Sequence, residues 1–389
     1  MGTLRFVVLL AVAAAGSVVL AGGASASHGQ ASDVVGHVYI NDNTAPVNTV
    51  GGFDRHGDGT LTPISGSPFV VGGAGLGHGD ASQGALQLSE DGRYLLAVDA
   101  GSDQISVLRI KPDGSLQIAE GSPVSSNGAN PVSIAVYGGL VYVANQGPGI
   151  NPGDTNYTGF TLNPGGHLRP LLGSTVALPS SSSPGDVLFS SDGSKLVGTE
   201  IAASVIDSFT VGADGLLTAA PGSPGFTTGQ GYGQLGSEFS PTNPDQLFVS
   251  DAHTSGGLPA PGLVSSFTDA ANGVLTPIGT SPFSNDGLAS CWVEISHDGL
   301  YLFVVNTASK TISSYSIAAG GALTFLHSTP SADLGAGPTD ARLSPDGSTL
   351  WVVEGSNAVV GFTVSGGTLA PLSTTPGPSG ATPSGIVVT

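Results

Sequence analysis

The stretch Leu343-Ser344-Pro345-Asp346-Gly347-Ser348-Thr349-Leu350-Trp351-Val352-Val353-Glu354 reads as a strand, a tight turn and a second strand. Pro, Asp and Gly together favour such a turn. The second half recurs, each time as an apolar or β-branched run that ends in Asn, Asp or Glu. The six other copies are Val38–Asn41, Leu96–Asp99, Tyr142–Asn145, Val197–Glu200, Phe248–Asp251 and Phe303–Asn306. They predict a repeat of about 52 residues.

A second marker, Gly-x-Leu, follows each copy. Its glycine suits a hairpin turn because the backbone there needs a positive φ. The seven pairs are Gly59/Leu61, Gly114/Leu116, Gly166/Leu168, Gly215/Leu217, Gly273/Leu275, Gly321/Leu323 and Gly367/Leu369. The two markers therefore indicate seven repeats.

A repeat near this length, with about four short strands in each unit, is typical of propeller blades. No long window has the apolar period of a helix, so we expect few helices. The first unit begins at His37–Ile40 without an opening strand, and Pro383–Thr389 resembles the missing strand. The sequence therefore predicts an all-β, seven-bladed propeller of four-stranded blades, closed by pairing of the C-terminal strand with the N-terminal blade.

The N-terminal residues resemble a secretion signal. Arg5 precedes the apolar run Phe6–Leu20, and Ala24-Ser25-Ala26 suits a cleavage site. The predicted organisation is a signal peptide over 1–26, a flexible tail over 27–34 and the propeller over 35–389. We expect a secreted, extracellular monomer without a membrane span after cleavage; an uncleaved membrane anchor is the alternative.

Composition limits the partners. The formal net charge is −19, with nine Lys and Arg residues in 389. So few basic residues cannot form a phosphate-binding surface, which argues against nucleic acid. Cys291 is the single cysteine, so no intramolecular disulfide can form. We expect a buried, unreactive thiol there, since no neighbouring His or basic residue would favour a thiolate.

The innermost strand of each blade is the best place to search for a site, because these strands surround the central channel. Residues alternate between the two faces of a strand. Aligning the inner strands on their apolar pairs places five charged residues on the channel face: Asp186, Glu238, Glu294, Asp340 and Arg342. They either line a wet channel and neutralise one another, or bind a cation or activate water.

Further candidates lie near the starts of these strands. His78 and Asp80 precede the second blade's inner strand, and Trp292 lies beside Glu294. All three could contact a ligand at the same channel mouth, or His78 and Asp80 could belong to a loop without such a role. No cofactor is expected, although a divalent cation held by the channel carboxylates is compatible with either function below.

Two segments carry a family resemblance: Ser89–Asp99 and Ser344–Gly347, each followed by Asp or Gly, any residue and Leu. They resemble the lactonase family of seven-bladed propellers, which includes the propeller type of 6-phosphogluconolactonase and carboxymuconate-lactonising enzymes. The resemblance implies this fold over nearly the whole mature chain and a lactone-hydrolysing activity.

The sequence departs from that family where inner strands begin. Phosphogluconolactonase-like members tend to carry His and Arg there, whereas this chain has Gly84, Gly185/Asp186, Cys291/Trp292 and Thr339/Asp340. A channel rich in carboxylates would repel a phosphorylated sugar, which disfavours 6-phosphogluconolactone as a substrate.

Two functions remain open from the sequence. One is hydrolysis of an uncharged or cationic lactone or related ester, in which Glu238 or Glu294 activates water and Arg342 stabilises the oxyanion. The other is a non-catalytic extracellular propeller that binds a glycan, a cell-wall component or a protein. A convergent acidic pocket would favour the first, and a plugged channel with a broad exposed loop face would favour the second.

Overall fold

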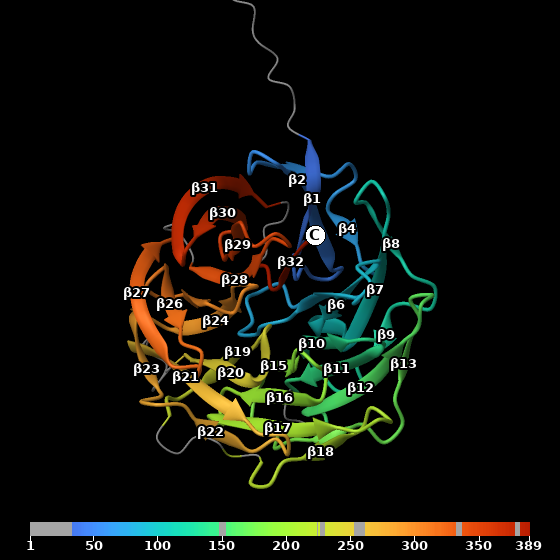
Figure 1. Cartoon of the computed structure of the whole chain (residues 1–389). Coiled ribbons are helices and arrows are strands. Elements are labelled where there is room, and N and C mark those ends of the chain that lie inside the picture. Colours follow the sequence, from blue (N-terminus) through green and yellow to red (C-terminus); the bar gives the residue numbers. More distant parts are fainter. Residues whose placement is uncertain are drawn as a thin grey trace, which may run out of the picture. The chain divides into compact units, whose positions relative to one another are not determined.

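The computed structural model describes residues 33–147, 153–223, 225, 230–252, 261–331, 337–377 and 382–389. Within them, seven antiparallel sheets form a ring, as Figure 1 shows. The helical content of these ranges is the short 3₁₀ turn η1, Ala100–Ser102. The predicted all-β seven-bladed propeller is therefore confirmed. The predicted signal peptide lies outside the described residues.

Each blade has four principal strands, and four blades carry a fifth short strand. We number the blades in chain order. Blade 1 contains β32 (Ile386–Val388), β1 (Val34–Asn41), β2 (Thr49–His56), β3 (Leu61–Pro63) and β4 (Phe69–Val70). Blade 2 contains β5 (Leu86–Leu88), β6 (Tyr94–Asp99), β7 (Gln104–Ile110), β8 (Leu116–Ile118) and β9 (Val124–Ser125). Blade 3 contains β10 (Pro131–Tyr137), β11 (Leu140–Asn145), β12 (Asn156–Leu162), β13 (Leu168–Pro170) and β14 (Val176–Ala177).

The remaining blades follow the same order from the channel outwards. Blade 4 contains β15 (Pro184–Phe189), β16 (Lys195–Glu200), β17 (Val205–Val211) and β18 (Leu217–Ala219). Blade 5 contains β19 (Gln234–Ser240), β20 (Asn243–Asp251), β21 (Pro261–Asp269), β22 (Leu275–Pro277) and β23 (Phe283–Leu288). Blade 6 contains β24 (Ser290–Ile295), β25 (Tyr301–Asn306), β26 (Thr311–Ile317) and β27 (Leu323–Pro330). Blade 7 contains β28 (Pro338–Leu343), β29 (Thr349–Glu354), β30 (Ala358–Ser365) and β31 (Thr368–Pro376).

The ring closes as the sequence predicts. Strand β32 pairs antiparallel with β1, with Val387 opposite Tyr39, and it forms the inner edge of blade 1 (Figure 1). Ile386, Val387 and Val388 are all buried. This pairing leaves no free strand at the join, so the two ends of the repeat hold the ring together.

Apolar side chains between neighbouring blades form the core. Val38, Ile40 and Phe53 of blade 1 pack with Trp351 and Val353 of blade 7. Equivalent clusters of Val, Leu, Ile and aromatic residues fill the other blade contacts. No helix of the described residues is long and apolar enough to cross a membrane. The blades thus form a fixed frame around the inner strands.

Candidate functional site

The channel is surrounded by seven inner strands, each next to its neighbour round the ring: β5, β10, β15, β19, β24, β28 and β32. Alternate residues of these strands are buried between the blades, as the apolar pairs Ala341/Leu343 and Val293/Ile295 show. The residues between them face the channel. The five charged candidates therefore converge from β15, β19, β24 and β28.

Arg342 and Glu294 form an ion pair between blades 7 and 6. The Arg342 Nη1 atom lies 3.1 Å from Glu294 Oε2, and the Leu343 amide donates to Glu294 Oε1 at 2.9 Å. The Arg342 side chain is 22% exposed, whereas that of Glu294 is 7% exposed. The ion pair leaves part of the guanidinium open to the channel.

Asp186 holds three blades together. Its Oδ1 accepts a bond from the Ser133 hydroxyl at 3.0 Å, and its Oδ2 accepts bonds from the Ser237 amide at 2.9 Å and the Ser237 hydroxyl at 2.7 Å. Ser133, Asp186 and Ser237 belong to β10, β15 and β19. These bonds occupy both carboxylate oxygens, so the geometry gives Asp186 a positioning role.

Glu238 and Asp340 are the less satisfied carboxyl groups. Glu238 Oε2 and Asp340 Oδ2 are buried and accept no hydrogen bond from the described residues. Burial raises the pKa of Glu238 well above its usual range, and the charge of Glu294 raises it further. Burial likewise raises the pKa of Asp340 to about 7. Both groups can therefore hold a proton closer to neutral pH than an exposed carboxyl can.

Arg342 keeps its charge in this setting. Burial acts to lower the Arg342 pKa, but the negative charges of Glu294 and Glu238 raise it above its ordinary value. The channel thus combines a cation with carboxyl groups, two of which have a raised pKa. That arrangement can stabilise a developing negative charge and transfer a proton.

One mouth of the channel is closed by Ser82 and Gln83, which precede β5. The Gln83 amide donates to Gly185 O at 3.0 Å in blade 4. Its side chain donates to Ser237 O at 2.9 Å and accepts the Val293 amide at 3.0 Å. A segment of blade 2 therefore reaches blades 4, 5 and 6 across the axis, and Gln83 is only 4% exposed. We name Ser82–Gln83 the plug.

The plug corrects the expected position of the site. The sequence pointed to the mouth where the inner strands begin, and the plug covers that mouth. The reason is local chemistry: one Gln side chain carries both a donor and an acceptor, which match the Ser237 carbonyl in the middle of β19 and the Val293 amide in the second half of β24. A single Gln in a loop rich in Ser and Gly gives no sequence signal for this role.

The other predicted ligand residues lie around the plug. Trp292 is buried, and its indole nitrogen donates to Ser82 O at 2.5 Å, so it supports the plug. His78 is exposed, with Nδ1 3.0 Å from Gly79 O. Asp80 Oδ1 accepts the Ala81 amide at 2.9 Å. None of these hydrogen bonds joins the three residues to the charged residues of the channel.

The channel opens at the opposite end, where inner strands finish. A cavity of about 230 Å³ lies there. Its lining comprises Gln87, Leu88, His297, Arg342, Leu343, Pro345, Val387 and Val388. Arg342 connects this cavity with Glu294 in the channel. The sequence does not predict His297 in this lining; its only signal is its place two residues after the end of β24.

Two other expectations concern a thiol and a cation. Cys291 is buried, and burial raises its pKa to about 11, as expected for an unreactive thiol. Within the described ranges, no group of three or more His, Cys, Asp or Glu side chains is arranged to hold a metal ion. The divalent cation stays a prediction.

Comparison with known proteins supports the fold. The model of a family described as "Lactonase, 7-bladed beta-propeller" matches residues 17–149, about a third of the chain, and confirms the expected resemblance. No curated protein matches the chain.

Three solved structures share the fold. A putative 6-phosphogluconolactonase from Bacteroides uniformis has 20% identity and a TM-score of 0.72, over 91% of this chain and 99% of that one. The periplasmic gluconolactonase of Pseudomonas aeruginosa has 19% identity and a TM-score of 0.69, over 91% and 98%. A protein from Lactobacillus plantarum has 18% identity and a TM-score of 0.67, over 91% and 99%.

Proposed function

Starting from a propeller that resembles the lactonase family, we propose that this chain hydrolyses an uncharged or cationic lactone or related ester. The observation that carries the proposal is Arg342, a partly exposed cation that Glu294 fixes at the boundary between the carboxyl groups and the open cavity. The names of the two lactonases among the similar structures point to the same reaction class.

The proposed reaction begins with the acyl oxygen of the substrate against Arg342. Ionised Glu238 accepts a proton from water as the water oxygen attacks the acyl carbon. The electron pair of the C=O bond moves to oxygen, where the Arg342 charge stabilises it. The tetrahedral intermediate then collapses, the ring C–O bond breaks, and protonated Glu238 returns the proton to the alkoxide. One lactone and one water give one hydroxy acid.

The charge of the channel selects the substrate. Asp186, Glu238, Glu294 and Asp340 surround one cation, Arg342, and a dianionic phosphate would meet net repulsion. We therefore infer a substrate without a phosphate group. Secretion, which the N-terminal sequence predicts, is part of the same proposal and would give the protein extracellular lactones or esters.

The test is hydrolysis of a panel of neutral lactones, followed by proton release, with and without a chelator. We expect Arg342→Gln to lower kcat by about 10²–10³-fold and Glu238→Gln by about 10²–10⁴-fold. Glu294→Gln should lower kcat less, because Glu294 only positions Arg342. Arg109→Gln and Glu120→Gln are matched controls, since both side chains are exposed and far from the inner strands.

The two control variants should retain the wild-type rate of hydrolysis.

The activity of the wild type should rise with pH through a pKa above that of an ordinary glutamate, because only the ionised form of Glu238 accepts the proton. The plug is one of the two features expected of the non-catalytic binding propeller. Absence of turnover on every lactone would therefore contradict the proposal and would leave that function, whose ligand is a glycan, a cell-wall component or a protein.

A further inference from the structure

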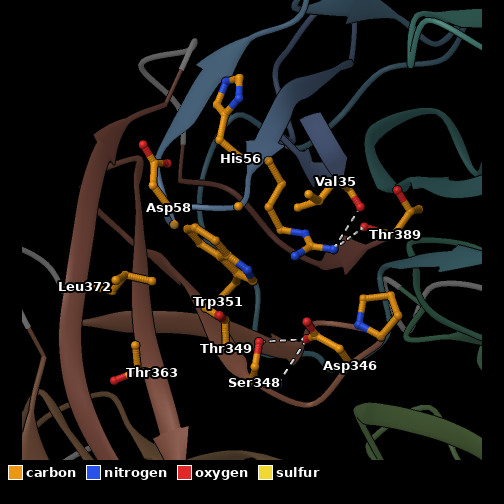
Figure 2. Close-up of a pocket in the computed structure, with 14 residues that line it drawn as sticks. Val35, His56, Asp58, Asp346, Ser348, Thr349, Trp351, Thr363, Leu372 and Thr389 are labelled. Atoms are coloured by element: carbon orange, nitrogen blue, oxygen red, sulfur yellow. Dashed lines mark hydrogen bonds between the residues drawn. The ribbon is translucent and has the colours of Figure 1, made fainter. Parts of the chain in front are cut away.

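A second cavity lies where the ring closes, between blades 1 and 7. Its volume is about 550 Å³. Figure 2 shows its walls, which come from β1, β2 and the following turn, β29, β30, β31 and the residue after β32. Pro345 lines both this cavity and the channel cavity. We name the second cavity the seam pocket; the hydrolysis proposed above makes no use of it.

Two buried donors in its lining have unused N–H groups. Arg55 is 8% exposed, and its Nη2 donates to Thr389 O at 3.1 Å and Val35 O at 3.3 Å, while its Nε has no hydrogen-bond partner. Trp351 is fully buried, and its Nε1 also lacks a partner. Buried donors are nearly always satisfied in proteins, so these two call for an acceptor.

The seam pocket also contains two carboxylates, Asp346 and Asp58. Asp346 accepts bonds from Ser344 and Ser348, and the Ser344 bond, followed by the Ser348 bonds and the Arg55 charge, lowers the Asp346 pKa to about 2. Asp58 also lines the pocket. In Figure 2 the indole nitrogen of Trp351 is turned to the side of Asp346 and Thr389, away from Leu372. Donors and carboxylates therefore share one pocket.

This mixture excludes an ion of either sign as the best ligand. An anion would be attracted by Arg55 and repelled by Asp346 and Asp58, and a cation would meet the reverse. A neutral polyol carries hydroxyl groups that accept from Arg55 and Trp351 and donate to the carboxylates. We propose that the seam pocket binds a neutral, polyhydroxylated ligand of the size of a sugar residue.

The volume is compatible with this class of ligand, since small-molecule pockets commonly enclose about 300–1,000 Å³. Leu372 and Pro345 supply apolar surface for the carbon face of a sugar ring. The ligand is either a free monosaccharide or the terminal unit of a glycan. Both present the same hydroxyl chemistry, so the experiment must separate them.

The test is isothermal titration of the whole protein with D-glucose, D-galactose and N-acetyl-D-glucosamine, and with oligosaccharides that end in each of them. Thr363→Trp should abolish binding, because Thr363 is exposed and lines the seam pocket. Thr161→Trp is the matched control: Thr161 holds the same place in blade 3, opposite the first residue of its neighbouring strand, and lies outside the seam pocket.

Binding of a monosaccharide that Thr363→Trp abolishes and Thr161→Trp preserves would support a site for free sugars. Binding of the oligosaccharides alone, with the same response to the variants, would support a glycan terminus. Trp351→Phe removes one N–H and keeps an aromatic ring, so affinity should fall about threefold to tenfold. The thermal midpoint of the Trp351→Phe variant, measured without ligand, shows whether the variant is folded.

Three outcomes would overturn the inference. One is the absence of binding by every sugar and oligosaccharide. Another is binding that Thr363→Trp leaves unchanged. The third is a preference for acetate or citrate over the neutral sugars. Glu238→Gln should keep full sugar affinity, which separates this inference from the proposed hydrolysis.

Discussion

Replacing Asp340 by Asn should remove part of a strong pH dependence of stability. Asp340 lies in the channel at 1% exposure, with Oδ2 unpaired and a pKa raised to about 7, chiefly by burial. Its ionised form is therefore disfavoured in the folded protein relative to the unfolded chain. Asn has nearly the same shape and no charge to bury.

The magnitude follows from the pKa difference. Raising the Asp340 pKa from its ordinary value of 3.8 to about 7 is equivalent to about 4 kcal/mol. Because the folded-state pKa is raised, this stability is fully present below about pH 4 and is lost as the pH rises to about 7. Above pH 7 the contribution is constant. Asp340→Asn should thus stabilise the protein by up to about 4 kcal/mol at pH 8.5 and by only about 1 kcal/mol at pH 4.5.

The assay is urea unfolding of both proteins at pH 4.5 and pH 8.5. Asp286→Asn is the control, since Asp286 is exposed on β23 and its substitution should leave the pH dependence of the wild type intact. A wild-type stability that rises between these two pH values would refute the reasoning. So would an Asp340→Asn protein that is less stable than the wild type at pH 8.5.

Two further predictions concern the plug and the thiol. Gln83→Ala should lower the free energy of unfolding by about 1–3 kcal/mol, because it leaves the buried Val293 amide unpaired; urea unfolding measures this, and exposed Gln117→Ala should be neutral. Cys291 should resist alkylation in the folded protein at pH 8 and react after unfolding in urea, since burial raises its pKa to about 11; rapid labelling without urea would contradict this.

The fold was predictable because every blade has to bury its two faces in the same way. A blade of four strands cannot cover both of its faces, so the burial pattern has to repeat at blade spacing. The closure was predictable for the same reason: Pro383–Thr389 has the apolar pattern of an inner strand, and the first repeat lacks one. The pairing of Val387 with Tyr39 follows from that pattern.

The site was predictable only in part. Strand alternation is regular, so it placed Arg342 and Glu294 on the same face of adjacent strands, where they form an ion pair. It could not place Gln83, because a loop before a strand has no periodicity and its path depends on contacts with three other blades. His297 follows a strand end and was missed for the same reason.

The plug also determines how the channel can work. It closes the mouth at the strand starts, and the open cavity lies at the strand ends beside Arg342. The cavity beside Arg342 is therefore the entrance that the proposed hydrolysis uses. Burial raises the pKa values of both Glu238 and Asp340. Gln83 accepts the Val293 amide one residue before Glu294, and its side chain donates to the Ser237 carbonyl one residue before Glu238, so the plug positions the backbone that carries both glutamates.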